Sequence, residues 1–381
     1  MTSTATHNAY GTTTERVLFM ALELSENTWK LGFTTGPGHK PREHAVAARD
    51  PGRLLQAIAL AKRRFGLPDT APVVRCYEAG RAGFWLHRFF QAQGLINQVV
   101  DASAIAVNRR QRRTKSDGWD VRKLLRMLRH YAQGEREVWR VMHVPSVAAE
   151  DGRHRHRDLA TLKQERASTT TRLKALLRSQ GIRLTSLSKL PEQLDALRLW
   201  AGSELPSGLR RRVLRVWAHH QFLSEQIAAL EAARRALLHS SEDASLEQVR
   251  QLMHLKGNGI NGAWLLVMAL CGWRALKNRR EVGGVAGVTP TPYHSGASAR
   301  EQGITKSEHR HGRWMTTELA WSWIRYQPES TLSCWFRERF GSGGKRLRRI
   351  GIVAVARQLL MALWRVLHTG VLPEGAELKA A

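Results

Sequence analysis

Two carboxylates stand three residues apart at the start of a strongly helical pattern. Asp117 and Asp120 lie in TKSDGWDVRKLL, and residues three apart share one face of a helix, with Cβ atoms roughly 5–6 Å apart. Two acids this close repel each other unless a cation lies between them or one stays protonated. The pattern leaves two interpretations open. It is a divalent-metal site, or it is a solvated helix start neutralised by arginines, which is the commoner origin of so short a motif.

Two further acids stand at the ends of predicted strands. Glu23 closes the apolar run of residues 16–24, and Glu78 follows the buried-strand pattern of residues 71–77. Carboxylates from three distant segments could converge and hold two Mg²⁺ or Mn²⁺ ions for phosphoryl transfer, because oxygen ligands suit these ions better than zinc. Taken separately, each glutamate is also consistent with an ordinary strand-end carboxylate at the surface.

The elements that must position these acids follow from the hydrophobic patterns. The patterns predict strands over residues 16–24, 28–35, 42–48, 71–77 and 96–100, and helices over 50–64 and 82–92, from Ser103 and from Gly118. The first three strands can pair as an antiparallel meander, and the later crossovers make parallel neighbours. This order places the ends of the first and fourth strands side by side. It is the order expected of a ribonuclease-H-like (RuvC-like) α/β fold.

A long helical region follows Pro145 and predicts an arm. Its second half has a spacing of four and three, the pattern of a coiled-coil seam, in which all positions but His220 and Arg234 are apolar: Leu209, Val213, Val216, His220, Leu223, Ile227, Leu230, Arg234 and Leu237. The seam indicates either a helical hairpin within one chain or a dimer interface. We expect the coiled-coil arm to cover residues 144–245.

The C-terminal part predicts a helical domain over residues 246–370. Residues 252–270 are expected to form a helix, a glycine turn and an apolar helix, either a phosphate-binding helix-hairpin-helix or a simple tight turn. Residues 281–313 are the least helix-like and are predicted to form a basic loop. A tryptophan-rich helix is expected over 314–326, and a basic linker over 337–349 leads to an apolar helix.

Composition points to a polyanionic partner. The 381 residues include 60 Lys and Arg against 32 Asp and Glu, which gives a formal net charge of +28. A surplus spread through the chain favours nucleic acid. We expect no membrane span, because the apolar run of residues 262–273 is too short. Residues 1–15 are expected to be disordered and carry no secretory pattern, so the chain is expected to be cytoplasmic. Cys76, Cys271 and Cys334 are isolated, which argues against disulfides and zinc.

Two sets of motifs resemble the transposases of the insertion sequence 110 family. The N-terminal set is ALELSENTW, CYEAGRAGFWLHR and RRQRRTKSDGWDVRKLL, and the C-terminal set is GVAGVTPTPYHSGASAREQGITKSEHRHGRWMTTELAW. The two sets stand in the family's order with the arm between them, and the resemblance covers about residues 16–370. It implies a DEDD-type, Holliday-junction-resolvase-like domain over 16–143, a C-terminal serine-containing domain, and a short tail over 371–381.

The resemblance assigns roles to individual residues. The family's four acids, which bind metal, fall on Glu23, Glu78, Asp117 and Asp120. The first is a departure, because the family's usual acid there is Asp, and the extra methylene of Glu moves the oxygens. Glu26 is a weaker candidate for this position.

The same resemblance places the nucleophilic serine at Ser295, with Ser298 as the reserve. Without the resemblance, a serine beside a glycine is ordinary turn chemistry. Basic residues around the two motif sets are candidate nucleic-acid contacts: Lys115, Lys306, Arg310 and Arg313. A solvated basic face is an equally good interpretation of these four residues.

The family's activity is DNA recombination that excises and inserts a circular element. The resemblance implies an element-encoded guide RNA, DNA as the substrate, Mg²⁺ or Mn²⁺ as the cofactor, and a dimer or tetramer whose protomers share composite sites. Two rivals remain open. One is a metal-dependent, structure-specific nuclease that hydrolyses with water, and the other is a non-catalytic scaffold that binds nucleic acid.

Overall fold

The chain forms two compact units, Met1–Val144 and Pro145–Ala381. The computed structural model describes residues 16–80, 83–101, 117–184, 186–188, 190–240, 242–272, 274, 276–295, 298–304 and 310–380, with the backbone alone described at 117–119, 291–295 and 298–302. The helix predicted from Ser103 lies outside the described residues.

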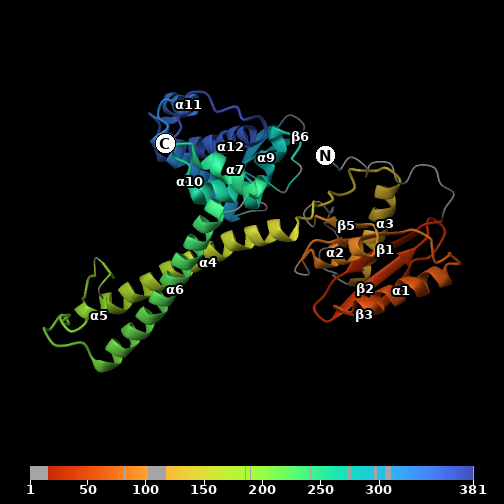
Figure 1. Cartoon of the computed structure of the whole chain (residues 1–381), viewed down its shortest axis with the longest axis horizontal. Helices are drawn as coiled ribbons and strands as arrows, with labels where there is room; N and C mark the ends of the chain where they lie inside the picture. Colours follow the sequence, from red (N-terminus) through yellow and green to blue (C-terminus); the bar gives the residue numbers. More distant parts are fainter. Residues whose placement is uncertain are drawn as a thin grey trace. The chain divides into compact units, whose positions relative to one another are not determined.

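A five-stranded mixed sheet forms the centre of the first unit (Figure 1). Its strands are β1 (Leu18–Glu23), β2 (Thr28–Thr34), β3 (Arg42–Ala47), β4 (Val73–Glu78) and β5 (Asn97–Val100). The order across the sheet is β3-β2-β1-β4-β5; β1, β2 and β3 pair antiparallel, while β4 is parallel to both β1 and β5. The predicted meander and the parallel pairing of the first and fourth strands are confirmed.

Helices cover both faces of this sheet. On one face, α1 (Pro51–Arg64) and α2 (Trp85–Ala92) bury the even-numbered residues of β1, such as Met20. Asp50 caps α1 by accepting a hydrogen bond from the Arg53 amide at 2.9 Å. On the other face lies α3 (Asp117–Ala132). The sheet is therefore the middle of three layers.

Gly32 sets the distance between α3 and the sheet. A Cβ added at Gly32 would lie 2.3 Å from Cγ1 of Val121 and 2.7 Å from Cδ1 of Leu125. Any side chain at this position would push the helix away from the strands. Gly32 pairs with Ala21 of β1, which lies two residues before Glu23. The close contact between α3 and the sheet is therefore near the strand end that carries Glu23. This close approach fixes the helix that begins with the predicted acid pair.

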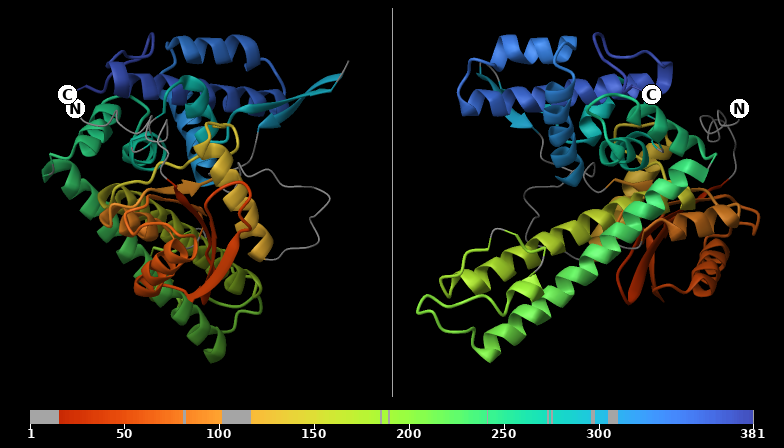
Figure 2. Two further views of the ribbon diagram at one scale, coloured as in Figure 1. Left: turned by 90° about the vertical axis from the view of Figure 1, so that its right-hand side faces the viewer. Right: turned by 60° about the vertical axis from the view of Figure 1, so that its left-hand side comes forward.

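The second unit begins with two long helices that pair along the arm, α4 (Val147–Arg178) and α6 (Ser207–Ser240) (Figure 2). The short helix α5 (Leu190–Gln193) lies at the far end of the pair. Most of the predicted seam residues of α6 are buried within the chain, namely Leu209, Val213, Val216, Leu223, Ile227 and Arg234. The seam serves a hairpin within the chain, and an arm-mediated dimer stays a prediction.

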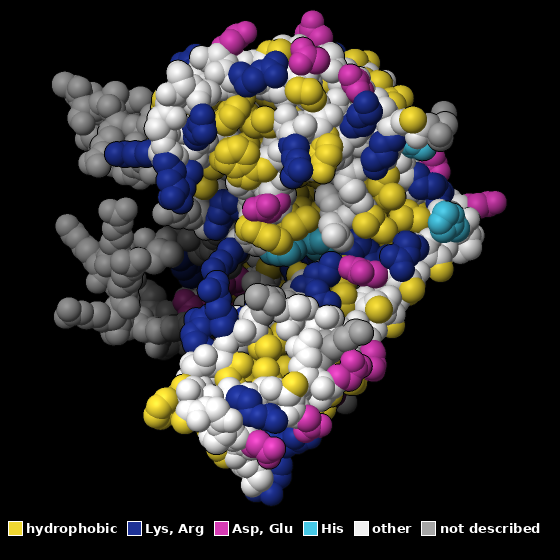
Figure 3. Space-filling model, turned by 90° about the vertical axis from the view of Figure 1, so that its left-hand side faces the viewer, with side chains coloured by type: hydrophobic (Ala, Val, Ile, Leu, Met, Phe, Trp, Pro, Cys, Tyr) yellow, Lys and Arg dark blue, Asp and Glu magenta, His cyan; other side chains and the backbone are white. Residues whose placement is uncertain are grey.

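A helical bundle completes the second unit. It contains α7 (Ala244–Met253), α8 (Ile260–Trp264), the buried π-helix η3 (Leu265–Cys271), α9 (Arg279–Val285), α10 (Arg310–Tyr326), α11 (Thr331–Phe340) and α12 (Lys345–Thr369). Lys and Arg side chains are spread over the face of the bundle in Figure 3, with apolar side chains between them.

The linker predicted over residues 337–349 is wrong. Arg337 lies inside α11, and α12 begins at Lys345, so only residues 341–344 connect the two helices. The basic residues in this segment suggested a linker, but arginine and lysine are good helix formers and here belong to the ends of the two helices.

α12 is long and apolar enough to cross a membrane by length and composition. The absence of a membrane span was expected from the short apolar run of residues 262–273 and not from α12. Eight residues of α12 are buried in the bundle, including Val355, Leu359 and Leu363. Such burial is typical of the core helix of a globular domain.

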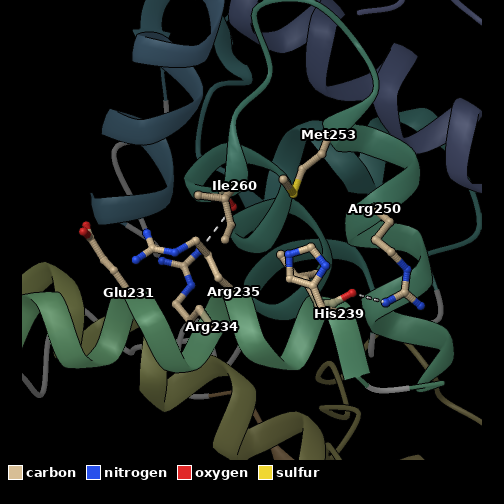
Figure 4. Close-up of a pocket in the computed structure, with 8 residues that line it drawn as sticks. Glu231, Arg234, Arg235, His239, Arg250, Met253 and Ile260 are labelled. Atoms are coloured by element: carbon tan, nitrogen blue, oxygen red, sulfur yellow. Dashed lines mark hydrogen bonds between the residues drawn. The ribbon is translucent and has the colours of Figure 1, made fainter. Parts of the chain in front are cut away.

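Arg234 joins the arm to the bundle (Figure 4). Its side chain is 1% exposed, and its guanidinium donates to Oδ1 of Asn261 at 3.0 Å and to the carbonyl of Ile260 at 3.2 Å. The guanidinium carbon also lies 4.6 Å from the ring centroid of Trp264. Burial lowers the pKa of Arg234 to about 10, so the side chain stays charged at neutral pH. A cation at a predicted seam position thus holds α6 against α8.

The glycine turn between α7 and α8 is packed against protein. Gly257 has φ of +76°, and a Cβ there would lie 3.1 Å from the carbonyl oxygen of Ser322 on α10. The Ser322 hydroxyl donates to the Gly257 carbonyl at 2.7 Å, and Lys379 Nζ donates to the Asn258 carbonyl at 3.0 Å. Of the two interpretations of this motif, the structure favours the tight turn.

Candidate functional site

Glu23 and Glu78 line one cleft of 480 Å³ at the carboxyl ends of β1 and β4. The register between these parallel strands pairs Leu22 with Tyr77, so the two glutamates occupy the next positions on neighbouring strands. Glu23 is half-buried and Glu78 is exposed. The structure therefore brings together two of the four predicted acids, from segments more than 50 residues apart.

Both glutamates continue rows of side chains that pack under α3, while Trp29 and Trp85 of the opposite layer also line the cleft. Ala21 and Cys76 pack under α3, and the residues two positions further along each strand, Glu23 and Glu78, share that face. Asp120 lies half-buried in the first turn of α3 and is not among the residues that line the cleft. Asp117 begins the helix, but its side chain lies outside the described residues.

The donor set of the cleft fits a hard divalent cation. Carboxylate oxygens from two strand ends are the ligand type that Mg²⁺ and Mn²⁺ prefer. Within the described part of the chain, no group of three or more His, Cys, Asp or Glu side chains is close enough to hold a metal. A complete site would therefore need the carboxylate of Asp117, a movement of α3, or oxygens from a substrate phosphate.

Glu26 also lines the cleft and pairs there with Arg49. Its Oε1 accepts from Nη2 of Arg49 at 2.6 Å, and 73% of its side chain is exposed. Arg49 has φ of +62°, an uncommon conformation for a residue other than glycine. Glu23 ends β1 whereas Glu26 lies beyond the strand, which favours Glu23 as the strand acid of the cleft.

Ser295 stands at the end of a strand, which corrects the predicted basic loop. Residues 279–304 form α9 and a hairpin of β6 (Pro290–Ser295) and β7 (Ser298–Ile304). Ser295 pairs with Ser298 across the hairpin. Proline rarely occurs inside strands, and here the register shifts between Pro290 and Pro292, which explains why the pattern did not suggest a hairpin. The hairpin projects from the bundle (Figure 2).

Arg310 and Arg313 lie in the first turn of α10, just after the hairpin. Arg310 is exposed, whereas Nη1 of Arg313 is covered and has no hydrogen-bond acceptor among the described residues. A covered cationic donor without an acceptor is consistent with the predicted phosphate contact. Lys115 and Lys306 lie outside the described residues.

The two buried cysteines, Cys76 and Cys271, lie in an environment that disfavours the thiolate. Burial raises the pKa of Cys271 to about 12 and raises that of Cys76 as well. Both thiols therefore stay protonated and are poor nucleophiles. Cys334 is half-buried, and all three cysteines are free, as their isolated positions predicted.

Sequence reasoning missed a row of arginines on α12. Arg349, Arg357 and Arg365 are spaced by eight residues and lie beside the base of the β6–β7 hairpin. The signal was weak: at about 100° per residue, eight positions turn a helix by about 80° beyond two full turns, so the three arginines spread across the half of α12 that is not buried. It was obscured because the segment was divided between a linker and an apolar helix.

Comparison with known proteins defines the class of this chain as a transposase. Residues 249–333 match the profile of the Transposase IS116/IS110/IS902 family. The putative transposase y4rJ of Sinorhizobium fredii (strain NBRC 101917 / NGR234) is 37% identical over 374 residues, which cover 95% of this chain and 94% of the relative. The transposase for insertion sequence element IS1328 of Yersinia enterocolitica is 28% identical over 174 residues, 44% of this chain and 47% of that protein. The chain therefore belongs to the IS116/IS110/IS902 family of insertion-sequence transposases.

Proposed function

We propose that this transposase cuts and rejoins DNA with a metal-binding acid site in the first unit and a serine nucleophile in the second. The observation that carries the proposal is the register of β1 and β4, which puts Glu23 and Glu78 into one cleft. The strand order of the sheet supports a ribonuclease-H-like, DEDD-type assignment for this unit.

Glu23 and Glu78 of the cleft, together with Asp117 and Asp120 of α3, would hold Mg²⁺ or Mn²⁺. When bound, such an ion withdraws charge from a scissile phosphate and stabilises the leaving oxygen. The protein's own contribution is to hold two carboxylates at neighbouring strand ends on the face that α3 covers. This arrangement keeps the acids fixed on the sheet while the substrate arrives.

Ser295 would supply the nucleophile. Its hydroxyl oxygen forms a bond to phosphorus as the bond from phosphorus to one deoxyribose oxygen breaks. The serine proton passes to solvent or a nearby base, and the departing deoxyribose oxygen takes up a proton. The phosphoserine link conserves the phosphodiester bond energy, so a deoxyribose hydroxyl of another strand can reverse the step and rejoin the DNA.

The proposal also includes a guide RNA and an oligomeric assembly. An element-encoded guide RNA would choose the target by base pairing, and the net charge of +28 supports a large nucleic-acid partner. The working protein would be a cytoplasmic dimer or tetramer, in which protomers complete each other's sites.

Excision of the parent element in cells tests this proposal. Circle junctions would be sequenced for wild type, Ser295→Ala, Ser298→Ala and Asp117→Ala, with the flanking noncoding DNA supplied or removed. We expect Ser295→Ala, Asp117→Ala and removal of the noncoding DNA to abolish junctions, and Ser298→Ala to retain them. Junctions from Ser295→Ala would instead support a nuclease that uses water. Wild type without junctions would support a binding scaffold.

A further inference from the structure

A basic groove of 1300 Å³ lies between α9, α12 and residues 371–374 of the second unit. Six arginines line it, namely Arg279, Arg280, Arg346, Arg349, Arg357 and Arg365, against the single acid Glu374. None of the six has an ion-pair partner among the described side chains. Cations gathered in a concave surface with so little opposing charge create a field that attracts a polyanion.

The face of α12 that lines the groove is distinct from the face that is buried. Arg349, Arg357 and Arg365 follow each other at eight-residue intervals, about 12 Å apart along a helix that rises 1.5 Å per residue. One strand of B-form DNA carries a phosphate about every 3.4 Å along the helix axis. Arg349 and Arg365 are therefore about 24 Å apart along α12, a length that holds about seven phosphates of one sugar-phosphate backbone.

Two covered donors in the groove wall lack acceptors. Nε of Arg357 and Nε1 of Trp364 are shielded from solvent and make no hydrogen bond within the described part of the chain. Both atoms can only donate, and a covered donor without an acceptor is costly. Both donors belong to residues that line the groove, and a phosphate oxygen is the kind of acceptor that they lack.

The groove continues onto the serine hairpin. Pro290, the first residue of β6, and Ile304, the last residue of β7, line the groove. A strand lying along α12 would therefore run to the base of the hairpin whose other end carries Ser295. This continuity favours DNA as the occupant, because the strand joined to Ser295 in the proposed function is DNA.

We propose that this groove, between α9, α12 and residues 371–374, binds the sugar-phosphate backbone of the DNA strand that leads to Ser295. The inference rests on the proposed function for its choice of DNA. It adds a binding site, formed by Arg349, Arg357, Arg365 and Trp364, that contacts phosphates and no bases.

Salt-dependent binding of the full-length protein tests the inference. Anisotropy of a fluorescein-labelled 30-base-pair duplex would be measured from low to high NaCl. The double variant Arg357→Gln/Arg365→Gln should reduce the slope of log affinity against log salt by about 1.8, since each lost phosphate contact on duplex DNA contributes about 0.9. The exposed single variant Arg365→Gln should reduce it by about 0.9 and guards against misfolding of the double variant.

The matched control removes the same charge outside the groove. Arg337 pairs with Glu329 at 3.9 Å, and Arg348 donates to the Gly341 carbonyl at 2.6 Å, so Arg337→Gln/Arg348→Gln should keep the wild-type slope. Trp364→Phe should weaken binding about fivefold with an unchanged slope, because it removes one neutral hydrogen bond.

Two outcomes would overturn the inference. One is an equal slope for the groove and control variants. The other is a loss of affinity for a labelled RNA of the same sequence but not for DNA, which would assign the groove to RNA. Binding does not require cleavage, so these results are independent of whether Ser295→Ala abolishes excision.

Discussion

The imidazole Nε2 of His156 lies 3.0 Å from Nε2 of His311. His156 belongs to α4 of the arm and is 4% exposed, whereas His311 lies in the first turn of α10, the helix that follows the serine hairpin. One ring must donate and the other accept, so this contact requires at least one neutral imidazole. Burial lowers the pKa of His311, and the nearby Arg157 lowers it further.

This contact predicts a loss of stability in mild acid. In the unfolded chain His311 takes up a proton near its ordinary pKa of about 6.5, but in the folded protein it does so only at lower pH. Stability is therefore complete well above a pH of about 6.5 and declines as the pH falls through about 6.5 toward the lower pKa of the folded state. The midpoint of thermal unfolding should fall over this window, and His311→Asn should flatten the dependence. An exposed histidine of α6 provides the control His239→Asn, and equal slopes for both variants would count against the prediction.

The acid cleft predicts different results for two neighbouring glutamates. Glu23→Gln keeps the size of the side chain but removes its charge, and we expect circle junctions to fall roughly 100-fold or more, because even indirect partners of a metal commonly contribute about 10–100-fold. Glu23→Asp should retain junctions, since it restores the family's usual acid. Glu26→Gln removes the same charge from the same cleft but only breaks the ion pair with Arg49. Equal losses for Glu23→Gln and Glu26→Gln would refute the assignment.

The sheet was predictable because its signals are local. Short apolar runs at residues 16–24 and 71–77 mark buried strands, and the short connection after β1 permits only an antiparallel neighbour. Once the order is known, the adjacency of Glu23 and Glu78 follows from strand geometry alone.

The serine hairpin and the arginine groove were not predictable, because their signals are tertiary. Pro292 argues against a strand when the sequence is considered alone, and only the register shift beside it allows pairing. Arg357 resembles any solvated helical arginine until Gly283 and the packing of α9 place it in a groove wall. Likewise, nothing local distinguishes Gly32 from other strand glycines.

Gly32→Ala should destabilise the first unit. The added methyl would overlap Val121 and Leu125, and overpacking of this kind typically costs about 1–3 kcal/mol in the free energy of unfolding. Because α3 would shift, junction formation should fall even if the protein stays folded. Gly52→Ala in α1 is the control, since its Cβ would make an ordinary 3.4 Å contact with Asp50 and alanine favours a helix. Chemical denaturation measures both, and a stable Gly32→Ala protein would show that α3 can move without cost.

The joint between arm and bundle predicts the largest effect of a single arginine. Arg234→Ala removes the hydrogen bonds to Asn261 and Ile260 and the contact with the Trp264 ring, and leaves two covered carbonyl oxygens with fewer donors. Hydrogen bonds from a charged donor and a buried cation–π contact together suggest a loss on the order of 2–3 kcal/mol in the free energy of unfolding. Arg235→Ala removes an exposed neighbour on the same helix and should change stability little. Urea denaturation followed by tryptophan fluorescence compares the two. If both variants unfold at the same urea concentration, Arg234 is not what holds α6 to α8, and packing of apolar side chains such as Leu238 must hold the arm instead.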